Sequence, residues 1–542
     1  MPVTPTYPGV YVTEINSGVR TITGVATSIT AFIGCASEGP VNDPTIINSF
    51  ADFERSFGGL WYNSMMSYAV KDFFSNGGSQ AVIVRIFNYP DPSQDYTAWL
   101  SLPTSTLSPL SDPLVLEAIN PGTWGNLIGA AVDWNTQSPT QPPASPVSSA
   151  TPTLFNLTIF YNGVKVEQYV NVTLSDPTSP KYLPRVLEQS SGYLVVETDP
   201  SGNWILPGEI PAPSPIVNKI VVPVTAGGGG DGGTLLPNDY LGGQNGELGK
   251  TGIYALYNTD LFNLLCIPPA TRGGDTDISV LNAALELCVD RRAMLIVDPP
   301  FFWGSGTQPA NTALTNLSGL SLYGDIARNA ALYFPLVLEP DPLLKNQLDT
   351  FVPCGLIAGA MALTDTNRGV WKSPAGIDVA LNGVQKLQAK LTDAENGQLN
   401  PVGINCLRTF PLYGNVVWGA RTMRGADQEE DDYKYVAVRR MALFLEESLY
   451  RGTKWVVFEP NDTPLWGQIR LSIGAFMQNL FRQGAFQGSK PSDAYLVKCD
   501  SETTTQDDIN NGIVNILVGF APLKPAEFVI LQIQQITAQL DN

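Results

Sequence analysis

The sequence contains no histidine, and this absence excludes several classes of enzyme. Ser-His-Asp and Cys-His nucleophile systems, histidine-ligated metals and imidazole acid-base chemistry all need that side chain. Charged residues are also scarce, at 15% against about 25% in an average protein. Carboxylate pairs remain available, but with 50 acidic residues many pairs arise by chance.

Basic residues are outnumbered, 31 to 50, which gives a formal charge of −19. A general nucleic-acid binder or a binder of anionic membranes needs a basic field, so both classes are disfavoured. One stretch differs from the rest: residues 433–500 hold nine basic and six acidic residues. A local basic surface is therefore expected within an acidic protein.

Long hydrophobic runs and closely spaced cysteines are missing too. No stretch approaches the ~20 apolar residues of a membrane span, and the first ten residues lack the pattern of a secretion signal. The six cysteines lie far apart, with no C-x-x-C pair, so they are predicted to be small core residues in a reducing compartment.

At 542 residues the chain is expected to hold two to four domains of an α/β, multidomain protein. Apolar runs and helical spacings alternate over 20–88, as in "ITAFIGCA" (29–36), "SFADFERSFGG" with Ser49 as helix cap, and "AVIVRIF" (81–87). The predicted units are an N-terminal arm at 1–20, an α/β core at 21–88 and 245–420, an inserted β-rich domain at 89–244, a C-terminal domain at 421–526, and a terminal strand at 527–542.

The inserted domain is predicted from its composition. "QSPTQPPASPVSSATPT" (137–153) is rich in proline, serine and threonine, and Asn162-Gly163 is a hairpin signal between two β-type runs. The glycine-rich "GGGGDGG" (227–233) is expected to be a flexible end to this unit.

Three motifs partly match known kinds of binding site, but the spacing or context of each favours a different interpretation. "GGQNGELGKTG" (242–252) places Gln244 where a phosphate-binding loop needs glycine, and the preceding residues make a poor strand. The acidic run "DQEEDD" (427–432) lacks calcium-loop spacing, and a solvated linker before a helix is the better interpretation. "RTMRG" (421–425) is more typical of salt-bridging arginines than of an anion site. No cofactor, metal or catalytic residue is therefore predicted, and the protein is predicted not to be an enzyme.

Several separated motifs resemble one family. They are "PGVYVTEINSGVRTITGVATSITAFIGCASEGP" (8–40), "INPGTWGN" (119–126), "PCGLIAGAMALTDTNRGVWKSPAG" (353–376), "LNPVGINCLRTF", "VVWGARTM", "VRRMALFLEESL", "WVVFEPNDTPLW", "GAFQGSKPSDAYLVKCD" and "PAEFVILQI". Together they resemble contractile phage tail sheath proteins, in order and spacing. Residues 89–244 are the most diverged part of the resemblance.

The resemblance implies a structural subunit of a contractile tail sheath, stacked in rings that are usually six-fold. The rings surround an inner tube and shorten when a baseplate triggers them, which drives the tube through the target envelope. The implied partners are other copies of the chain, the tail tube protein, and baseplate and terminator proteins, without nucleic acid and without membrane insertion. The implied location is the virion tail, assembled in the cytoplasm of the bacterial host.

Both termini are predicted to form strands, which the resemblance makes candidates for interchain arms that add to sheets of neighbouring subunits. "YPGVYVTEI" (7–15) alternates with a period of two, behind prolines that suit an edge strand. A private hairpin through "NSG" (16–18) is the alternative there, and residues 527–533 are apolar enough to be a buried strand of their own domain. The arm residues are Val10, Tyr11, Val12, Thr13, Glu14, Ile15, Ile533, Gln534, Gln535, Ile536 and Thr537.

An acidic tube would be gripped by basic groups of the inner domain, through exposed ion pairs that are individually weak. The candidates for this contact are Lys434, Arg439, Arg440 and Arg451. Helical spacing does not allow all four to face one partner.

Two alternatives stay open beside a phage sheath. The first is the sheath of a bacteriocin or of another bacterial contractile injection system, of which a type VI secretion sheath is disfavoured because it divides the equivalent sequence between two chains. The second, more remote, is an enzyme on the α/β core, which the missing histidine, phosphate loop and metal cluster disfavour.

Overall fold

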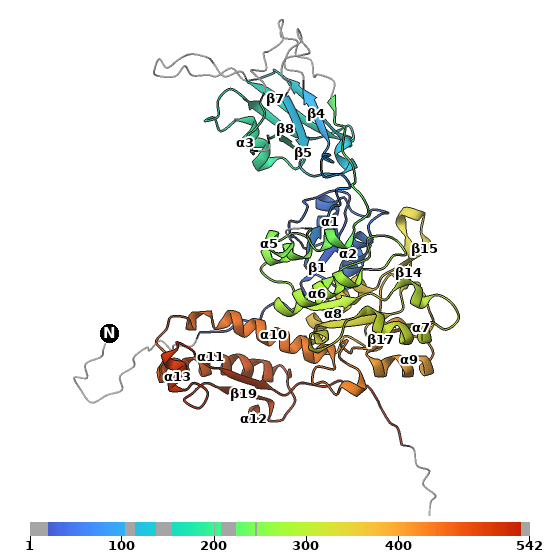
Figure 1. The fold of residues 1–542 in the computed structure, drawn as a ribbon, viewed down its shortest axis with the longest axis vertical. Helices are drawn as coiled ribbons and strands as arrows, with labels where there is room; N and C mark the ends of the chain where they lie inside the picture. The colour runs from blue at the N-terminus through green and yellow to red at the C-terminus, as the bar shows by residue number, and fades with distance from the viewer. Residues whose placement is uncertain are drawn as a thin grey trace, which may run out of the picture.

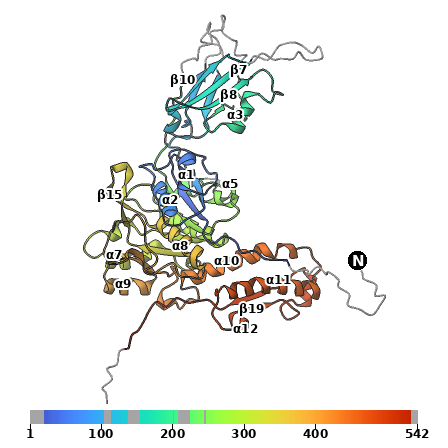
Figure 2. The same cartoon turned by 180° about the vertical axis from the view of Figure 1, so that it is seen from behind.

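The protein has a mixed α/β fold, as predicted. The computed structural model describes residues 20–102, 114–136, 154–199, 201–206, 224–243 and 246–532. Figure 1 shows an elongated molecule, with a β-rich unit at one end, a central α/β body, and a helical unit along the opposite side. The same three-part arrangement is seen from behind in Figure 2.

The central body is built on one large sheet. Its six inner strands are parallel, and an antiparallel strand closes each edge. Because both faces are covered, the inner strands read as continuous apolar runs, which is why they could be found in the sequence. In spatial order the strands are β18 (Gly414–Val417), β17 (Ile404–Phe410), β13 (Ala330–Phe334), β12 (Met294–Val297), β11 (Leu264–Cys266), β1 (Thr30–Gly34), β3 (Ala81–Arg85) and β2 (Thr45–Ile47).

Helices cover the two faces of this sheet with separate hydrophobic clusters. Phe32 of β1 points into one cluster, and the next residue, Ile33, points into the other. The first face carries α1 (Phe50–Phe57), α2 (Met65–Ser75) and α8 (Cys354–Arg368), and the second carries α6 (Ile278–Asp290) and α7 (Pro309–Asn316).

The remaining elements of the body are short. They are α4 (Pro237–Tyr240), α5 (Gly246–Gly249), α9 (Asp393–Leu399), a small sheet of β14 (Val337–Asp341), β15 (Gln347–Phe351) and β16 (Lys386–Leu387), and the 3₁₀ turns η2 (Gly252–Asn258), η3 (Phe301–Gly304), η4 (Leu317–Leu320), η5 (Asp325–Asn329), η6 (Pro342–Leu344), η7 (Asn400–Val402) and η8 (Asp427–Glu429).

Local signals fix the ends of the first two helices. The Ser49 hydroxyl accepts a hydrogen bond from the amide of Asp52, as predicted, and Ser64 caps α2 through the amide of Ser67. These bonds satisfy amides that have no partner within the helix.

The β-rich unit consists of two sheets packed around their own apolar cluster. Asn162 and Gly163 have positive φ and join two strands in a tight hairpin, as predicted. One sheet holds β10 (Val224–Thr225), β6 (Ile128–Asp133), β7 (Phe155–Tyr161) and β8 (Val164–Val172), and the other holds β4 (Trp99–Leu102), β5 (Leu114–Ala118) and β9 (Leu194–Val196), with η1 (Thr123–Leu127) and α3 (Leu183–Ser190) beside them.

The glycine-rich stretch 227–233 is held by hydrogen bonds where an open linker was expected. The Asp231 carboxylate accepts bonds from the amide and hydroxyl of Thr123, and the Asn126 amide group bonds the backbone of Gly229 in both directions. Glycine suits this stretch because the backbone passes so close to its neighbours that a Cβ at Gly229 would lie 2.5 Å from the carbonyl oxygen of Gly122.

The C-terminal unit packs two long helices on a two-stranded ribbon. α10 contributes Leu443 to the cluster of the central body and Leu445 to the cluster of this unit, so it joins the two. The elements are α10 (Val436–Gly452), η9 (Lys454–Val456), α11 (Thr463–Arg482), α12 (Pro491–Ala494), β19 (Tyr495–Lys498), α13 (Gln506–Asn510) and β20 (Leu517–Phe520).

All six cysteines lie in the described ranges and are free thiols, and only Cys35 is not buried. This agrees with their prediction as core residues. Among the described residues, no helix has the length and apolar character needed to cross a bilayer.

The contact between α2 and α8 gives a test of the core. A Cβ at Gly355 would lie 2.0 Å from the carbonyl oxygen of Ala69, which belongs to the backbone of α2 and cannot swing away. Gly355→Ala should therefore lower the stability by about 1–3 kcal/mol through overpacking, measured by thermal denaturation. Gly474→Ala is the matched control, because that helical glycine of α11 has open space around it and should gain about 0.5–1 kcal/mol. Equal shifts for the two variants would contradict this account.

Candidate assembly surfaces

The C-terminal segment, residues 523–532, is attached to the central body by an ion pair between Glu527 and the buried Arg421. Glu527 receives two hydrogen bonds from the guanidinium of Arg421, from Nε at 2.8 Å and from an Nη at 2.7 Å. The Tyr435 hydroxyl donates a third bond to the same carboxylate at 3.2 Å. A fork of this kind fixes the orientation of both groups as well as their separation.

Arg421 is only 1% exposed, so its charge needs partners inside the protein. Its second Nη donates to the Asp427 carboxylate and to the carbonyl oxygens of Asn400 and Gly425. Asn405 of β17 holds the backbone of Arg421 in place from both sides. We call Arg421, Asp427 and Glu527 the Arg421 node.

Two features of the sequence correspond to this node, although the sequence analysis does not predict it. An acid interrupts the apolar run "PAEFVIL", and an arginine follows the apolar run "VVWGA". Burial alone would raise the pKa of Glu527, but the hydrogen bonds and charge of Arg421 outweigh it and hold this pKa below its ordinary value.

Beyond the node, four apolar side chains stand in solvent. Phe528, Val529, Ile530 and Leu531 are 75% to 83% exposed and lie in no helix or strand. The alternative in which residues 527–533 form a buried strand of their own domain is therefore wrong for 527–531, because the described part of the chain provides no strand beside them. The predicted arm residues 533–537 lie outside the described residues, as do Val10 to Ile15.

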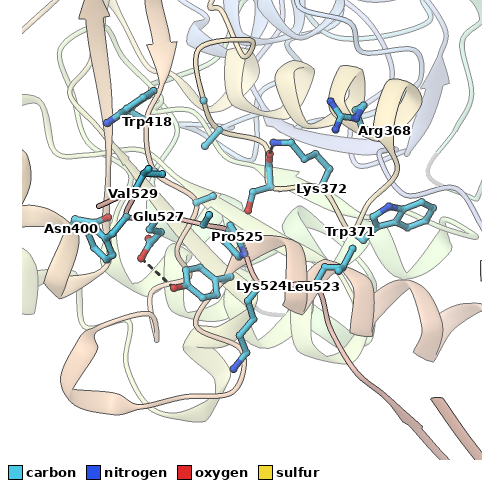
Figure 3. A pocket seen from close by; sticks show the side chains of 18 of the residues that line it. Arg368, Trp371, Lys372, Asn400, Trp418, Leu523, Lys524, Pro525, Glu527 and Val529 are labelled. Carbon is cyan, nitrogen blue, oxygen red and sulfur yellow. Dashed lines mark hydrogen bonds between the residues drawn. The ribbon is translucent and has the colours of Figure 1, made fainter. Parts of the chain in front are cut away.

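A groove opens beside this segment, shown in Figure 3. It encloses about 950 Å³ between the end of α8, the residues after β18, and residues 523–529. Trp371 and Trp418 give it aromatic walls, and Lys372 lies at its edge. Ser373, also in the lining, is nine-tenths buried, and its hydroxyl has no partner among the described residues.

The ribbon of β19 and β20 presents two open edges. The strands pair only with each other in the described part of the chain, and Leu496 and Leu517 are each 52% exposed. An isolated pair of strands is marginal in water, and each outer edge carries unpaired backbone groups that can accept another strand.

The other end of the described chain is fixed along α10. Residues 20–27 run against this helix: Ile22 packs at Gly452, the amide of Val25 donates to Ser448, and the carbonyl of Thr27 accepts from Arg440. The first described residue, Arg20, lies over the ring of Trp455. The segment thus follows α10 from its C-terminal end toward its N-terminal half.

The four predicted tube-facing basic residues all make bonds within the chain. Arg440 is 4% exposed and pairs with the buried carboxylate of Asp365, which removes it as a surface contact. Arg439 bonds Glu446 and the Asn329 side chain.

The other two keep a larger exposed fraction. Lys434 pairs with Asp427 of the Arg421 node, and Arg451 pairs with Asp260 and Glu447. The structure does not bring the four together on one face, because their carboxylate partners lie on different elements.

The acidic run 427–432 is a set of ion pairs where a solvated linker was expected. Asp431 is nearly buried and accepts bonds from Arg328 and Arg424, while Asp427 serves the Arg421 node. Both arginines of "RTMRG", Arg421 and Arg424, pair with carboxylates of the chain, so neither forms an open anion site. No cluster of metal-binding side chains occurs among the described residues.

The phosphate-loop-like stretch 242–252 follows the four-residue helix α4 and not a strand. It therefore lacks the strand–loop–helix context that a phosphate loop needs, in line with the sequence analysis.

Two adjacent parts of the chain match known domain families. Residues 337–423 match the central domain of phage tail sheath proteins, and residues 428–536 match the phage tail sheath C-terminal domain. The C-terminal part of the chain is thus similar to phage tail sheath proteins. The Arg421 node spans the two matched regions, with Arg421 in the first, Glu527 in the second and Asp427 just before the second.

Curated sheath proteins align with part of this chain. The tail sheath protein of Vibrio phage KVP40 is 27% identical over 252 residues, which are 45% of this chain and 35% of that protein. The tail sheath protein of Enterobacteria phage T4 is 26% identical over 187 residues, 34% of this chain and 26% of that protein. The alignments thus span about a third or less of the length of these relatives.

Solved sheath structures have the same fold over nearly the whole chain. A sheath complex of an extracellular contractile injection system, in its contracted state, has a TM-score of 0.56 at 20% identity and covers 98% of this chain and 99% of its own. A sheath tail protein of Listeria innocua has a TM-score of 0.57 at 13% identity, covering 93% and 96%.

Removal of the Glu527 charge should free the C-terminal segment, residues 523–532. A spin label at Lys524→Cys, in a Cys35→Ser background, reports its mobility by electron paramagnetic resonance. Glu527→Gln should weaken the attachment by about 1.5–3 kcal/mol and narrow the spectrum, because a charge-assisted fork is lost. Asp427→Asn removes a different partner of Arg421 and should leave the label as immobile as in the parent. A spectrum unchanged by Glu527→Gln would contradict the anchoring role.

The same label should respond to acid. The folded-state pKa of Glu527 lies below its ordinary value, so the ion pair stabilises the attachment fully above about pH 4.3 and loses this effect as the pH falls through the lowered pKa. The parent spectrum should narrow only below that ordinary value. The Glu527→Gln spectrum should be mobile throughout, and release of the parent segment near neutral pH would refute the assignment.

Proposed function

We propose that the chain is the structural subunit of a contractile sheath that polymerises as stacked rings around an inner tube and shortens to drive the tube through a target envelope. The two matches to phage tail sheath domains and the sheath fold over nearly the whole chain support this proposal. The family is structural, and no catalytic role is assigned to any residue.

The observation that carries the proposal is the β19–β20 ribbon with its two open edges, together with the exposed apolar run 528–531. An interchain strand on each edge would complete a four-stranded sheet, and the exposed run 528–531 would be covered in the same step. In this proposal residues 10–15 and 533–537 of neighbouring copies supply those strands. Backbone pairing then holds the lattice together.

The proposed partners are other copies in rings, a tail tube protein, and baseplate and terminator proteins. For the tube contact we retain Lys434 and Arg451, because their side chains keep about a quarter to a third of their surface in solvent. Arg439 is more covered, and Arg440 is withdrawn. We propose the virion tail, assembled in the host cytoplasm, as the location.

A specific observation supports a second kind of contractile system to which the proposed sheath could belong. Solved structures of similar fold include the contracted sheaths of an extracellular contractile injection system and of an anti-feeding prophage, each covering 98% of this chain. The alternative proposal is therefore a sheath of such a system, with the same subunit chemistry. The curated relatives, which are phage proteins, favour the virion.

The test is negative-stain electron microscopy of the purified full-length chain beside a variant that lacks residues 1–16. The full chain should form hollow striated cylinders, alone or when co-expressed with the tube protein. The truncated chain should keep the parent melting temperature and remain monomeric, because one ribbon edge loses its strand. Failure of the full chain to form cylinders in either setting would refute the sheath assignment, and normal cylinders from the truncated chain would refute the N-terminal arm.

A further inference from the structure

The loop between α10 and α11 carries an exposed aromatic side chain in a conformation that such residues rarely adopt. Phe458 is fully exposed and has a φ of +70°. Left-handed backbone at a bulky residue is costly, and it persists where the surrounding structure imposes it. Val457 beside it is also exposed, and Glu459 follows, which gives a Val-Phe-Glu projection that we call the Phe458 knob.

The knob is held rigidly from both sides. The turn η9 precedes it, and the amide of Glu459 donates to the carbonyl oxygen of Val456. On the other side, Asn461 bonds Trp466 and the carbonyl of Ile513, and Asp462 caps α11. The loop therefore orders an apolar side chain in water, which is the arrangement expected of a preorganised contact residue.

The groove beside the C-terminal segment has the complementary chemistry. Its aromatic walls, Trp371 and Trp418, suit a phenyl ring, and its cations Arg368, Lys372 and Lys524 suit a carboxylate. Ser373 adds a hydroxyl without a partner among the described residues. Burial, and then the charge of Arg368, lower the pKa of Lys372, and the opposing charge of Asp378 does not outweigh them.

Knob and groove of one chain lie at opposite ends of a helix. Tyr435, the N-terminal cap of α10, lines the groove, and the knob follows the C-terminal end of the same helix. The 17 residues of α10 separate them by about 25 Å, so they do not meet within one subunit. A contact between the knob of one copy and the groove of the next is head-to-tail, and such contacts build rings or helical arrays.

We propose that the Phe458 knob of one subunit inserts into the groove of a second copy, with Phe458 against the ring of Trp371 and the Glu459 carboxylate toward Lys372. The inference rests on the proposed sheath function, and it adds a side-chain contact distinct from strand addition. Arg20, where the described chain begins, lies beside the knob, with a guanidinium nitrogen 3.9 Å from a carboxylate oxygen of Glu459. In the proposed sheath, a neighbour that receives the residues before Arg20 is therefore adjacent to the knob.

The first test is photo-crosslinking. The photoreactive amino acid p-benzoylphenylalanine replaces Phe458, and isotopically light and heavy copies are mixed before polymerisation. Crosslinks should join position 458 of one copy to peptides that contain 368–376 or 523–529 of another. The matched control places the same group at Leu248, which is equally exposed but lies on α5.

Crosslinks from position 458 only to other regions, only to the tube protein, or absent from well-formed polymers would overturn the contact while the sheath function stands. A full-length chain that never polymerises would overturn both. As a second test, Phe458→Ala should keep the melting temperature but lower the polymerised fraction at least ten-fold at fixed concentration. Leu248→Ala should change neither, and a polymer yield for Phe458→Ala equal to that of the parent would refute the proposal.

Discussion

The arrangement of the C-terminal half depends on the need to neutralise one buried guanidinium. Arg421 enters the interior beside β17, and a charge there without partners costs several kcal/mol. Asp427 and Glu527 supply the compensating charges from segments that come before and after the whole C-terminal unit. The pair with Glu527 closes the chain on itself across 106 residues, and it fixes the point from which the terminal apolar run departs.

The helix α10 and its cap residue bind both ends of the described chain. Its N-terminal cap, Tyr435, bonds Glu527, and its later turns hold residues 20–27 through Arg440 and Ser448. Both ends of the described chain are therefore attached to one helix, which is packed into the hydrophobic clusters of two units. Glu527 is also bonded to Arg421, whose backbone is held by Asn405 of β17, so the C-terminal end is attached to the central sheet as well as to the start of α10.

The sequence predicted features whose cause is local. The Ser49 cap, the Asn162-Gly163 turn and the buried parallel strands follow from neighbouring residues, since caps, turns and apolar runs are decided within a few positions. It failed where the partner is distant in the chain. Arg440 was predicted as a surface cation, but it pairs with the buried Asp365. Asp431 was predicted to lie in a solvated linker, but it pairs with Arg328.

The candidate assembly surfaces also include one feature that the sequence predicts and others that it does not. The terminal strand pattern was visible in the sequence, but the groove was not, because its lining comes from α8, from the residues after β18 and from 523–529. The Phe458 knob was within a recognised motif, yet nothing in "WVVFEP" distinguishes an outward phenylalanine from a buried one. Only the backbone conformation at Phe458 and its exposure do so.

The two kinds of proposed contact differ in what they tolerate. The proposed strand addition on the β19–β20 ribbon depends on main-chain hydrogen bonds, which persist when whole subunits rotate as rigid bodies. A knob in a groove depends on the exact placement of one ring and one carboxylate, so a small rotation removes it. A lattice that must remain connected and yet change its dimensions needs both kinds. Strand pairs are then the permanent links, and contacts such as that of Phe458 are those whose strength distinguishes one lattice state from another.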